Sequence, residues 1–369
     1  MSMPRKPVVV ITGATGLIGS RLSSDLARDH AVFALDIKQP DREIDGVQWI
    51  ECDLTAEESV RHALETIAAA AEPQLASVIH LAAYYDFSGE PSDLYRELTV
   101  EGTRRLLRGL RSFQVEQFVF SSSLLVMEPV EEKEALTEKS PTAGEWDYPA
   151  SKLAAEQVIR EERGSMPAII LRIAGVYDED GHSIPIGHQI RRIYEESMES
   201  HFFPGDMTHG QPFVHVDDLV ACFRKVVERR AELGPYEIFL IAEDEVMSYR
   251  DLQDQIGKRL HGEEWFTMRI PKSVAKAGAW VKDNFTSDDP FIKPWMIDLA
   301  DDHYPVDIAK ARKRLAWQPQ HRLRETLPEM LARLQQDPRR WYEINGFGEP
   351  PADRVDSNQS ATRRERAER

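Results

Sequence analysis

The segment PVVVITGATGLIG, residues 7–19, decides the fold, because three glycines join a strand-like run to a helix-like run. The run PVVVITG (7–13) is short, apolar and rich in β-branched residues, as expected for a strand that is buried on both faces. After it, Ile18, Leu22 and Leu26 recur at every fourth position, which predicts the apolar stripe of an amphipathic helix. A strand, a glycine-rich turn and a helix in this order make the first half of a βαβ unit.

The alternation of strand-like and helix-like segments continues to residue 180. Apolar runs predict further strands at 30–36, 47–54, 77–83, 117–123 and 168–176. Helical periodicity predicts helices at 17–29, 59–71, 92–112 and 147–163. Thr55 and Glu58 have the spacing of a capping box ahead of the second helix. Six strands that alternate with helices predict an α/β fold built on a doubly wound parallel sheet.

Beyond residue 180 the alternation weakens, and the remaining segments are mixed. A strand is predicted at 236–242, and helices are predicted at 248–262, 271–285 and 323–336. We therefore expect a main domain and a smaller C-terminal lobe. The main domain comprises residues 1–180 with 213–242 returning to it, and the lobe comprises 181–212 and 243–345. The last residues, 346–369, are polar and highly charged and are predicted to form a disordered tail.

Composition narrows the classes of partner and compartment. A content of 41% hydrophobic and 30% charged residues predicts a soluble globular protein, and a formal charge of −17 disfavours nucleic acid or an anionic membrane as partner. Cys52 and Cys222 suggest no disulfide framework. No uncharged apolar run has the length of a membrane span, and the start lacks the pattern of a signal peptide. We expect a cytoplasmic protein that acts on a small molecule.

The glycine-rich stretch TGATGLIG (12–19) predicts a dinucleotide site. Gly13 permits a tight turn, Gly16 lets the backbone approach a pyrophosphate, and Gly19 lets the helix pack closely on the strand. The N-terminus of the following helix offers free N–H groups and a partial positive charge to phosphate. This reading depends on the position of the glycines between a strand and a helix, since glycine alone is common in turns.

Asp36 ends the second predicted strand, about twenty residues beyond the glycine loop, where such sites place an acidic residue. A carboxylate there accepts hydrogen bonds from both ribose hydroxyls and repels a 2′-phosphate, which favours NAD(H) over NADP(H). Lys38 lies close enough to leave NADP(H) open, and a solvated turn aspartate is the alternative reading. Asp53, at the end of the third strand, is expected beside the adenine.

The segment WDYPASKLAAEQ (146–157) carries the predicted chemistry. Tyr148 and Lys152 are four residues apart, so on a helix they project from one face. The pair is either an exposed surface contact or a proton-transfer device. Oxidising an alcohol needs a base for the hydroxyl proton, and reducing a carbonyl needs an acid. A free tyrosine has a pKa of about 10, which a nearby lysine cation lowers. We predict Tyr148 as the acid/base and Ser123 as the donor to the substrate oxygen, with Ser122 as the alternative.

Jointly these motifs resemble the extended short-chain dehydrogenases/reductases over roughly residues 7–335. The resemblance is carried by TGATGLIG (12–19), CDL (52–54), HLAA (80–83), SSS (121–123), YPASK (148–152) and FVHVDD (213–218). It implies a Rossmann fold with a C-terminal substrate lobe, NAD as cofactor, and the catalytic set Ser123, Tyr148 and Lys152. It also implies that Lys152 holds the nicotinamide ribose.

The predicted cofactor contacts combine the glycine loop with what the resemblance implies. They are Gly13, Thr15, Gly16, Leu17, Ile18, Gly19, Asp36, Asp53, Leu54, Leu81, Ala82, Ala83, Ser121, Tyr148, Lys152, Ile173 and Val176. Most relatives are dimers, so a homodimer is expected through the helices at 92–111 and 147–163. Gly109, Ala154 and Ala155 would allow those helices to approach closely.

Three departures count against a nucleotide-sugar substrate. Ser123 is followed by Leu124 and Leu125, where dehydratases of such sugars place Asp-Glu. Ala174 stands where epimerases usually carry an Asn that contacts the diphosphate, and Gln211 stands where they usually carry an Arg. A diphosphate would be poorly neutralised in such a site. The segments MRIPKSVAKAGAW and HYPVDIAKARKRLAWQP instead resemble the branch of 3β-hydroxysteroid dehydrogenases.

An aromatic cluster follows the fourth strand, at the carboxyl edge of the sheet where ligands bind. The predicted substrate contacts are Tyr84, Tyr85, Phe87, Leu124, His182 and His188. Met127, Phe202 and Phe203 could complete an apolar pocket, although simple packing explains each aromatic residue equally well. Thr99 stands where the family usually has the Asn that supports the proton relay, which leaves the path of the relay open. His215, Asp217 and Asp218 are interpreted as a helix start capped by Asp217, so no metal site is predicted.

Three functions remain open from the sequence. The first is an NAD(H)-dependent oxidoreductase that interconverts a secondary alcohol and a ketone on a largely apolar molecule. The second is an epimerase that oxidises and re-reduces its substrate without releasing NAD. The third is a catalytically silent NAD-binding protein, which the presence of both Tyr148 and Lys152 disfavours.

Overall fold

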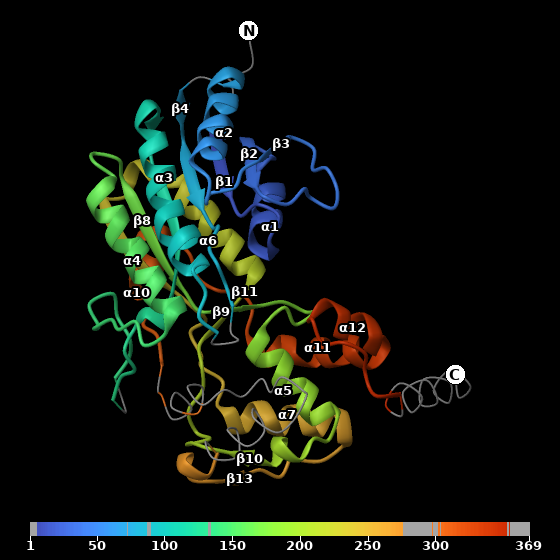
Figure 1. Cartoon of the computed structure of the whole chain (residues 1–369). Coiled ribbons are helices and arrows are strands. Elements are labelled where there is room, and N and C mark those ends of the chain that lie inside the picture. The colour runs from blue at the N-terminus through green and yellow to red at the C-terminus, as the bar shows by residue number, and fades with distance from the viewer. Residues whose placement is uncertain are drawn as a thin grey trace.

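The computed structural model describes residues 6–71, 73–86, 90–131, 134–275, 297, 302, 304–352 and 354. Its centre is a seven-stranded parallel sheet in the order β12-β8-β7-β5-β1-β2-β3 (Figure 1). These strands are β1 (Val8–Thr12), β2 (Ala31–Asp36), β3 (Val47–Glu51), β5 (Ser77–His80), β7 (Phe118–Ser123), β8 (Ala168–Ile173) and β12 (Tyr236–Ile241). The predicted doubly wound α/β fold is confirmed, and the strand that begins at Tyr236 joins the six expected ones as the seventh.

Helices cover both faces of the sheet, which explains why the first four residues of β1, Val8 to Ile11, are all apolar. Val9 and Ile11 pack with one group of helices, and Val8 and Val10 pack with the other. The first group is α1 (Leu17–Leu26), α6 (Val216–Glu228) and α10 (Ala309–Leu315). The second group is α2 (Glu57–Ala70), α3 (Glu101–Gly109) and α4 (Asp147–Glu162). Strands buried on both faces read as continuous apolar runs.

The chain reverses direction across the sheet beside β1, because β2 and β3 lie on one side of it and β5, β7 and β8 on the other. Ligands of such sheets bind at the carboxyl ends of the strands at this switch point. The glycine loop after β1, the segment after β5 and the serines at the end of β7 therefore lie at one edge.

A second apolar cluster builds the smaller lobe, which lies below the sheet in Figure 1. Its elements are α5 (Ile184–Tyr194), η4 (Met198–His201), β10 (Phe202–Phe203), α7 (Tyr249–His261), β13 (Met268–Arg269), α11 (Leu323–Gln336) and α12 (Pro338–Ile344). The pair β9 (Gly175–Tyr177) and β11 (Phe213–His215) connects this lobe to the sheet. Phe347 is buried in the lobe although it falls in the predicted tail, and residues 355–369 lie outside the described residues.

Short elements complete the fold. They are β4 (Gln74–Leu75), β6 (Gln114–Val115), η1 (Tyr95–Val100), η2 (Leu110–Ser112), η3 (Leu124–Val126) and η5 (Arg230–Glu232). The helix predicted at 92–112 is thus three consecutive elements, of which η1 is π-helical and α3 is α-helical. A π-helical turn frequently marks a functional site. Most of the helix predicted at 271–285 lies outside the described residues.

Two predicted helix caps are wrong. Thr55 does not cap α2, because its hydroxyl donates to Asp53 Oδ1 at 2.7 Å and the helix begins at Glu57 without a side-chain cap. Asp217 does not cap α6; the cap is His215, whose Nδ1 accepts from the Asp217 N–H at 3.2 Å. In both places a side chain near the expected cap makes the competing hydrogen bond.

The small residues expected at a dimer contact are largely used within the chain. A Cβ at Gly109 would overlap Leu64 of α2, and Ala155 is fully buried, whereas Ala154 faces outward. The homodimer stays a prediction, and of the three small residues only Ala154 supports it. No helix among the described residues is long and apolar enough to span a membrane.

Candidate active site

The glycine loop has the conformation that the sequence predicts. Gly13 has a φ of +69°, and a Cβ there would lie 2.7 Å from the backbone nitrogen of Ala82. A Cβ at Gly19 would overlap the carbonyl oxygen of Gly13, so the helix can pack this closely only without a side chain. A Cβ at Gly16 would meet only the Gly13 oxygen, at 3.5 Å, so Gly16 is not required by packing. This pattern fits backbone that a pyrophosphate can approach.

The start of α1 and the end of β2 fit NAD as well. Helix α1 begins at Leu17 behind Gly16, which makes no side-chain cap, so its first-turn N–H groups can face phosphate. Asp36 Oδ2 accepts from the Thr15 N–H at 3.0 Å, and Asp36 Oδ1 accepts from the Lys38 N–H at 3.2 Å. These bonds fix the carboxylate beside the glycine loop, where the ribose of a dinucleotide would lie. They leave Lys38 beside the same carboxylate.

The other predicted cofactor contacts gather around this loop. The Leu81 and Ala82 N–H groups donate to Thr12, just before the loop, at 3.1 and 3.3 Å. Asp53 turns the chain after β3, and Leu54 is buried beside it. The structure places Ile18 in α1, Ala83 after β5, Ile173 at the end of β8 and Val176 in β9.

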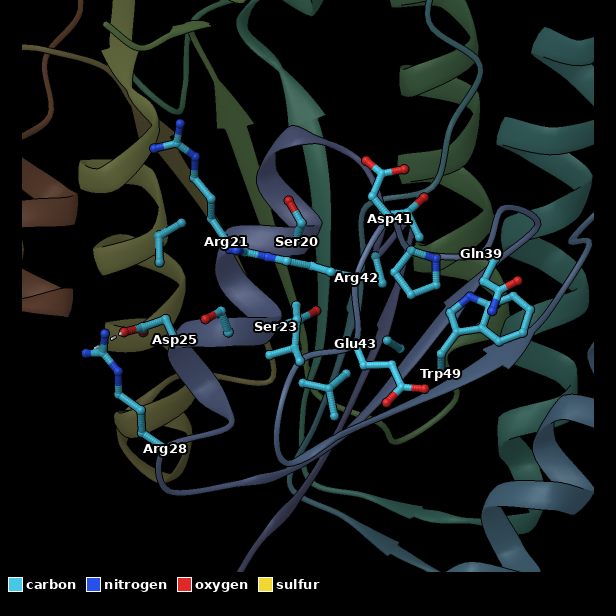
Figure 2. Close-up of a pocket in the computed structure, with 18 of the residues that line it drawn as sticks. Ser20, Arg21, Ser23, Asp25, Arg28, Gln39, Asp41, Arg42, Glu43 and Trp49 are labelled. Atoms are coloured by element: carbon cyan, nitrogen blue, oxygen red, sulfur yellow. Dashed lines mark ion pairs between the residues drawn. The ribbon is translucent and has the colours of Figure 1, made fainter. Parts of the chain in front are cut away.

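A cavity of about 970 Å³ lies between α1, α6 and the connection from β2 to β3 (Figure 2). Its lining includes Thr15 of the glycine loop, and Arg42 points from the connection toward α1. Tyr148 and Lys152 are not in its lining, so this cavity is separate from the predicted chemistry.

Tyr148 and Lys152 lie on the buried face of α4, next to the serines that end β7. Lys152 Nζ donates to the Ser121 carbonyl at 2.7 Å and lies 5.8 Å from the centre of the Tyr148 ring. Ser123 is hydrogen-bonded to Tyr148, and its Oγ accepts from the Leu125 N–H at 3.2 Å. The exposed fractions of Tyr148 and Lys152 are 8% and 3%, so the two residues do not form an exposed surface contact. The structure thus brings the predicted catalytic set together.

Burial dominates the electrostatics of this set. Burial raises the pKa of Tyr148, and the hydrogen bond from Ser123 opposes it only partly. Lys152 is not among the groups that shift this pKa, so the expected lowering of the Tyr148 pKa by Lys152 is not found. Burial also lowers the pKa of Lys152 to about 7, while the Glu156 carboxylate raises it. At neutral pH the Tyr148 phenol is therefore protonated, and the pH is close to the pKa of the Lys152 amine.

Two aromatic rings contact Tyr148. The Tyr85 ring meets it edge-on at 5.3 Å, and the Trp146 ring lies 5.6 Å away. Tyr84 in turn packs edge-on against Tyr95 at 4.8 Å. The sequence pattern does not predict a site role for Trp146 or Tyr95, although Trp146 lies two residues before the YPASK motif. Phe87 lies outside the described residues.

The carboxylates of Asp86 and Asp147 lie near the rings of Tyr84 and Tyr95. The Tyr84 hydroxyl donates to Asp86 Oδ2 at 3.3 Å, and the Tyr95 hydroxyl donates to the Asp86 carbonyl at 2.8 Å. Burial, Asp86, Tyr84 and Asp147 raise the pKa of Tyr95 to about 12. Asp86 and Asp147 therefore place negative charge near the Tyr95 hydroxyl.

Thr99 and His80 connect the glycine loop to the aromatic segment. The Thr103 hydroxyl donates to the Thr99 carbonyl at 2.6 Å, so it must accept from His80 Nε2 at 2.9 Å. Nδ1 of His80 then accepts from the Thr12 hydroxyl at 2.6 Å. Burial lowers the pKa of His80 to about 3 and keeps it neutral. Thr99 Oγ1 accepts from the Tyr84 N–H at 3.0 Å, so this hydroxyl holds the aromatic segment.

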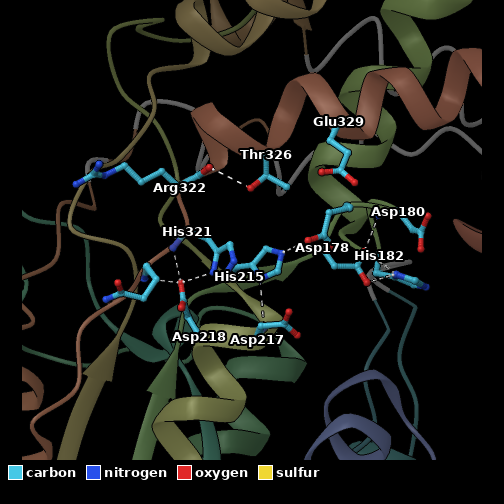
Figure 3. A network of polar contacts seen from close by, with 12 residues as sticks. Asp178, Asp180, His182, His215, Asp217, Asp218, His321, Arg322, Thr326 and Glu329 are labelled. Carbon is cyan, nitrogen blue, oxygen red and sulfur yellow. Dashed lines mark hydrogen bonds and ion pairs between the residues drawn. The ribbon is translucent and has the colours of Figure 1, made fainter.

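The two predicted histidines have partners within the protein. His182 Nδ1 lies 2.8 Å from Asp178, which is fully buried and also accepts from Arg21 of α1 (Figure 3). His188 packs edge-on against Phe347 at 4.6 Å, and burial lowers its pKa to about 3. Leu124 is buried in the core beside Ser123. None of these contacts places either histidine beside Tyr148.

A polar network joins the sheet to the smaller lobe (Figure 3). His215 at the start of α6 stacks on His321 at 4.1 Å, and Asp218 Oδ2 accepts from the His321 N–H at 2.8 Å. His215 and Asp218 therefore hold the segment before α11 in place. Within the described part of the chain, no three His, Cys, Asp or Glu side chains are arranged to hold a metal ion.

Comparisons with known proteins identify the family of the chain. The model of the NAD dependent epimerase/dehydratase family matches residues 9–242, more than half of the chain. Sterol-4-alpha-carboxylate 3-dehydrogenase (decarboxylating) of Candida albicans is 21% identical over 85% of this chain and 93% of its own length. UDP-glucose 4-epimerase of Vibrio cholerae is 24% identical over 88% and 93%.

A solved structure has the same fold. The UDP-glucose 4-epimerase of Thermus thermophilus in complex with NAD superposes with a TM-score of 0.65, at 22% identity over 88% of this chain and 98% of that one. The glycine loop, the Asp36 carboxylate and the Ser–Tyr–Lys set thus lie within a segment that matches one family of NAD-dependent enzymes. The chain belongs to the NAD dependent epimerase/dehydratase family.

Proposed function

We propose that the protein is an NAD(H)-dependent oxidoreductase that interconverts a secondary alcohol and a ketone on a largely apolar small molecule. The observation that carries this proposal is that Tyr148 and Lys152 are buried together against the serines of β7, with the rings of Tyr85 and Trp146 in contact with Tyr148. Apolar walls with a few convergent polar groups are typical of small-molecule sites.

In this proposal the protein supplies proton transfer and positioning, and NAD(H) supplies the hydride donor or acceptor. Ser123 holds the substrate oxygen next to the Tyr148 hydroxyl. In the reductive direction the protonated phenol donates its proton to the oxygen of the ketone. In the oxidative direction the phenol must first lose its proton, and the phenolate then takes the proton of the alcohol while protonated Lys152 stabilises it.

The charge of the site supports an apolar substrate over a nucleotide-sugar. A diphosphate needs cationic or amide donors, whereas positions 174 and 211 hold Ala174 and Gln211. Asp86 and Asp147 add negative charge near the Tyr95 hydroxyl. We accordingly propose residues 181–212 and 243–345 as the substrate lobe, with Tyr84 and Tyr85 at its border with the sheet.

An epimerase with tightly held NAD is the second candidate. The epimerase of Vibrio cholerae is as similar in identity and coverage as the sterol-carboxylate dehydrogenase of Candida albicans, so similarity alone does not separate the two reactions. An epimerase would retain bound NAD through purification and give no net change in NADH.

The test combines two substrate panels on the purified full chain. Hydrophobic ketones and secondary alcohols are followed by the absorbance of NADH, and UDP-sugars are followed by chromatography of the epimers. The proposal expects net change of NADH with the first panel and no epimers with the second. Epimer formation without net NADH change would replace it with the second candidate. Bound NAD with neither activity would indicate a silent NAD-binding protein.

A further inference from the structure

One turn after Lys152, the helix α4 carries a third buried ionisable side chain on the same face, that of Glu156. Glu156 follows Lys152 by four residues and Tyr148 by eight, so the three side chains stand at successive turns. Each contacts a different serine of β7. Tyr148 bonds Ser123, Lys152 bonds the Ser121 carbonyl, and Glu156 Oε1 accepts from the Ser122 hydroxyl at 2.6 Å.

Glu156 is also anchored to the neighbouring strand. Arg172 of β8 donates to it twice, from Nε to Oε1 at 3.1 Å and from the terminal nitrogen to Oε2 at 2.8 Å. Arg172 stands opposite Ser122 in the register of β7 and β8. The exposed fractions of the two side chains are only 6% and 4%. The carboxylate therefore ties α4 to both β7 and β8.

Stability alone is a poor explanation for this ion pair. Removing two charges from water is unfavourable, and well-packed apolar side chains of similar volume often stabilise a protein as much or more. A buried pair with saturated hydrogen bonds does fix one arrangement, because any shift of the helix leaves a charge unpaired. A shift along α4 would also separate Tyr148 from Ser123.

We propose that Glu156 is a positioning residue. Through its bonds to Ser122 and Arg172 it fixes the position of α4 along its axis, and with it the positions of Tyr148 and Lys152 relative to the serines of β7. This inference rests on the proposed role of Tyr148 as the acid/base. Glu156 does not touch the reacting atoms, and it acts through α4.

The same carboxylate also acts on the charge of Lys152. The groups that face Lys152 are Tyr148 and Glu156 from α4 and His80 from β5, and Arg172 of β8 lies beyond Glu156. His80 is held neutral, so Glu156 is the group that opposes the effect of burial on the Lys152 amine. Removing its negative charge lowers the pKa of Lys152 further.

The test uses the full chain with NAD and three variants. Glu156→Gln removes the charge, and Glu156→Met with Arg172→Met removes both charges and replaces them with apolar volume. Glu161→Gln is the matched control, because Glu161 is exposed on the same helix and bonds only Gln157 in the described contacts. Thermal unfolding establishes that each variant is folded.

The first readout needs no substrate. The ¹³Cε shift of labelled lysines is followed against pH, and Lys152 is assigned as the signal that is lost in Lys152→Arg. In the parent chain this lysine is expected to titrate near pH 7. In Glu156→Gln its midpoint should fall by about one unit or more. In the double variant the midpoint should also fall, because Glu156 is lost there as well, whereas in Glu161→Gln it should stay close to that of the parent chain.

The second readout is turnover with the substrate found for the proposed function. Glu156→Gln and the double variant should each lose at least about tenfold in kcat, with KM and NAD affinity changed much less, since a small displacement of reacting groups is costly. Glu161→Gln should turn over like the parent chain. A folded Glu156→Gln with unchanged midpoint, or a folded double variant with unchanged kcat, overturns the inference. If the parent chain turns over nothing, the proposed function fails, and the lysine titration still tests the effect of Glu156.

Discussion

Tyr148 and Lys152 are buried together one helical turn apart, with the lysine nitrogen 5.8 Å from the centre of the tyrosine ring. An ammonium group is rarely buried without an ionised partner in contact, because desolvation disfavours its charged form. Here it is held by the Ser121 carbonyl, and burial lowers its pKa to about 7. Such a group at a strand end where ligands bind is typical of a functional site.

The first prediction follows from this pKa. The pKa of Lys152 is about 7 in the folded chain and 10.5 as the ordinary value, so between these pH values the unfolded chain binds one more proton. The free energy of unfolding of the parent chain should therefore rise with pH across this window, relative to Lys152→Met, by on the order of a few kcal/mol. Urea unfolding without added NAD, at several pH values, measures the difference. Parallel pH dependences for the two chains would contradict it.

The second prediction separates two glycines of the loop. Gly13→Ala should destabilise the fold by about 1–3 kcal/mol and abolish NAD binding, because its φ is +69° and the new Cβ meets Ala82. Gly16→Ala should leave the melting temperature nearly unchanged, because its Cβ meets only an oxygen at 3.5 Å, yet it should weaken NAD binding. Thermal unfolding and NAD titration of both variants decide this. Equal loss of stability in the two variants would contradict the assignment.

The third prediction concerns the choice between NAD and NADP. Asp36→Asn keeps acceptor oxygen beside the Thr15 N–H but removes the negative charge that repels a 2′-phosphate. We expect the preference for NAD over NADP to fall by about tenfold or more, which is the effect of roughly one charge-assisted hydrogen bond. Dissociation constants for both dinucleotides measure it. An unchanged ratio would mean that Asp36 does not face the ribose.

The fourth prediction concerns the ion pairs that Glu162 of α4 makes with arginines of α3 and η2. Glu162 binds Arg104, Arg108 and Arg111 within 3.0 Å, and its hydrogen bonds with these arginines lower its pKa to about 2. A lowered carboxylate pKa gives stability that is present above the ordinary pKa of 4.5 and is lost as the pH falls toward 2. Glu162→Gln should therefore reduce stability at pH 7 and weaken its loss between these values. Urea unfolding at neutral and acidic pH tests this, with the exposed Glu161→Gln as control.

The sequence predicted the elements whose physical cause is local. The strand β8 (Ala168–Ile173) and its neighbours are apolar runs because both faces of the sheet are covered, although the strand predicted at 168–176 is two strands, β8 and β9. Gly13 and Gly19 mark positions where a Cβ has no room. The spacing of Tyr148 and Lys152 placed both on one face of a helix. These features depend on periodicity and on single residues.

Features that depend on distant partners were missed or misread. Glu156 sits at helical spacing from Lys152, so a charge on the buried face could have been noticed, but its partner Arg172 comes from another strand. The cap at Thr55 failed because Asp53 competes for its hydroxyl, and the tail prediction overlooked Phe347, which packs into the smaller lobe. The Tyr148 pKa depends on burial, which the helix pattern alone does not give.

The most direct test of the central claim is the change in NADH absorbance when the full chain and Tyr148→Phe are given the same panel of hydrophobic ketones. The account predicts net NADH oxidation by the parent chain and a loss of at least about 100-fold in kcat for the variant, since it removes only the acid hydroxyl. Tyr148→Phe that still binds NAD and turns over like the parent chain would contradict it.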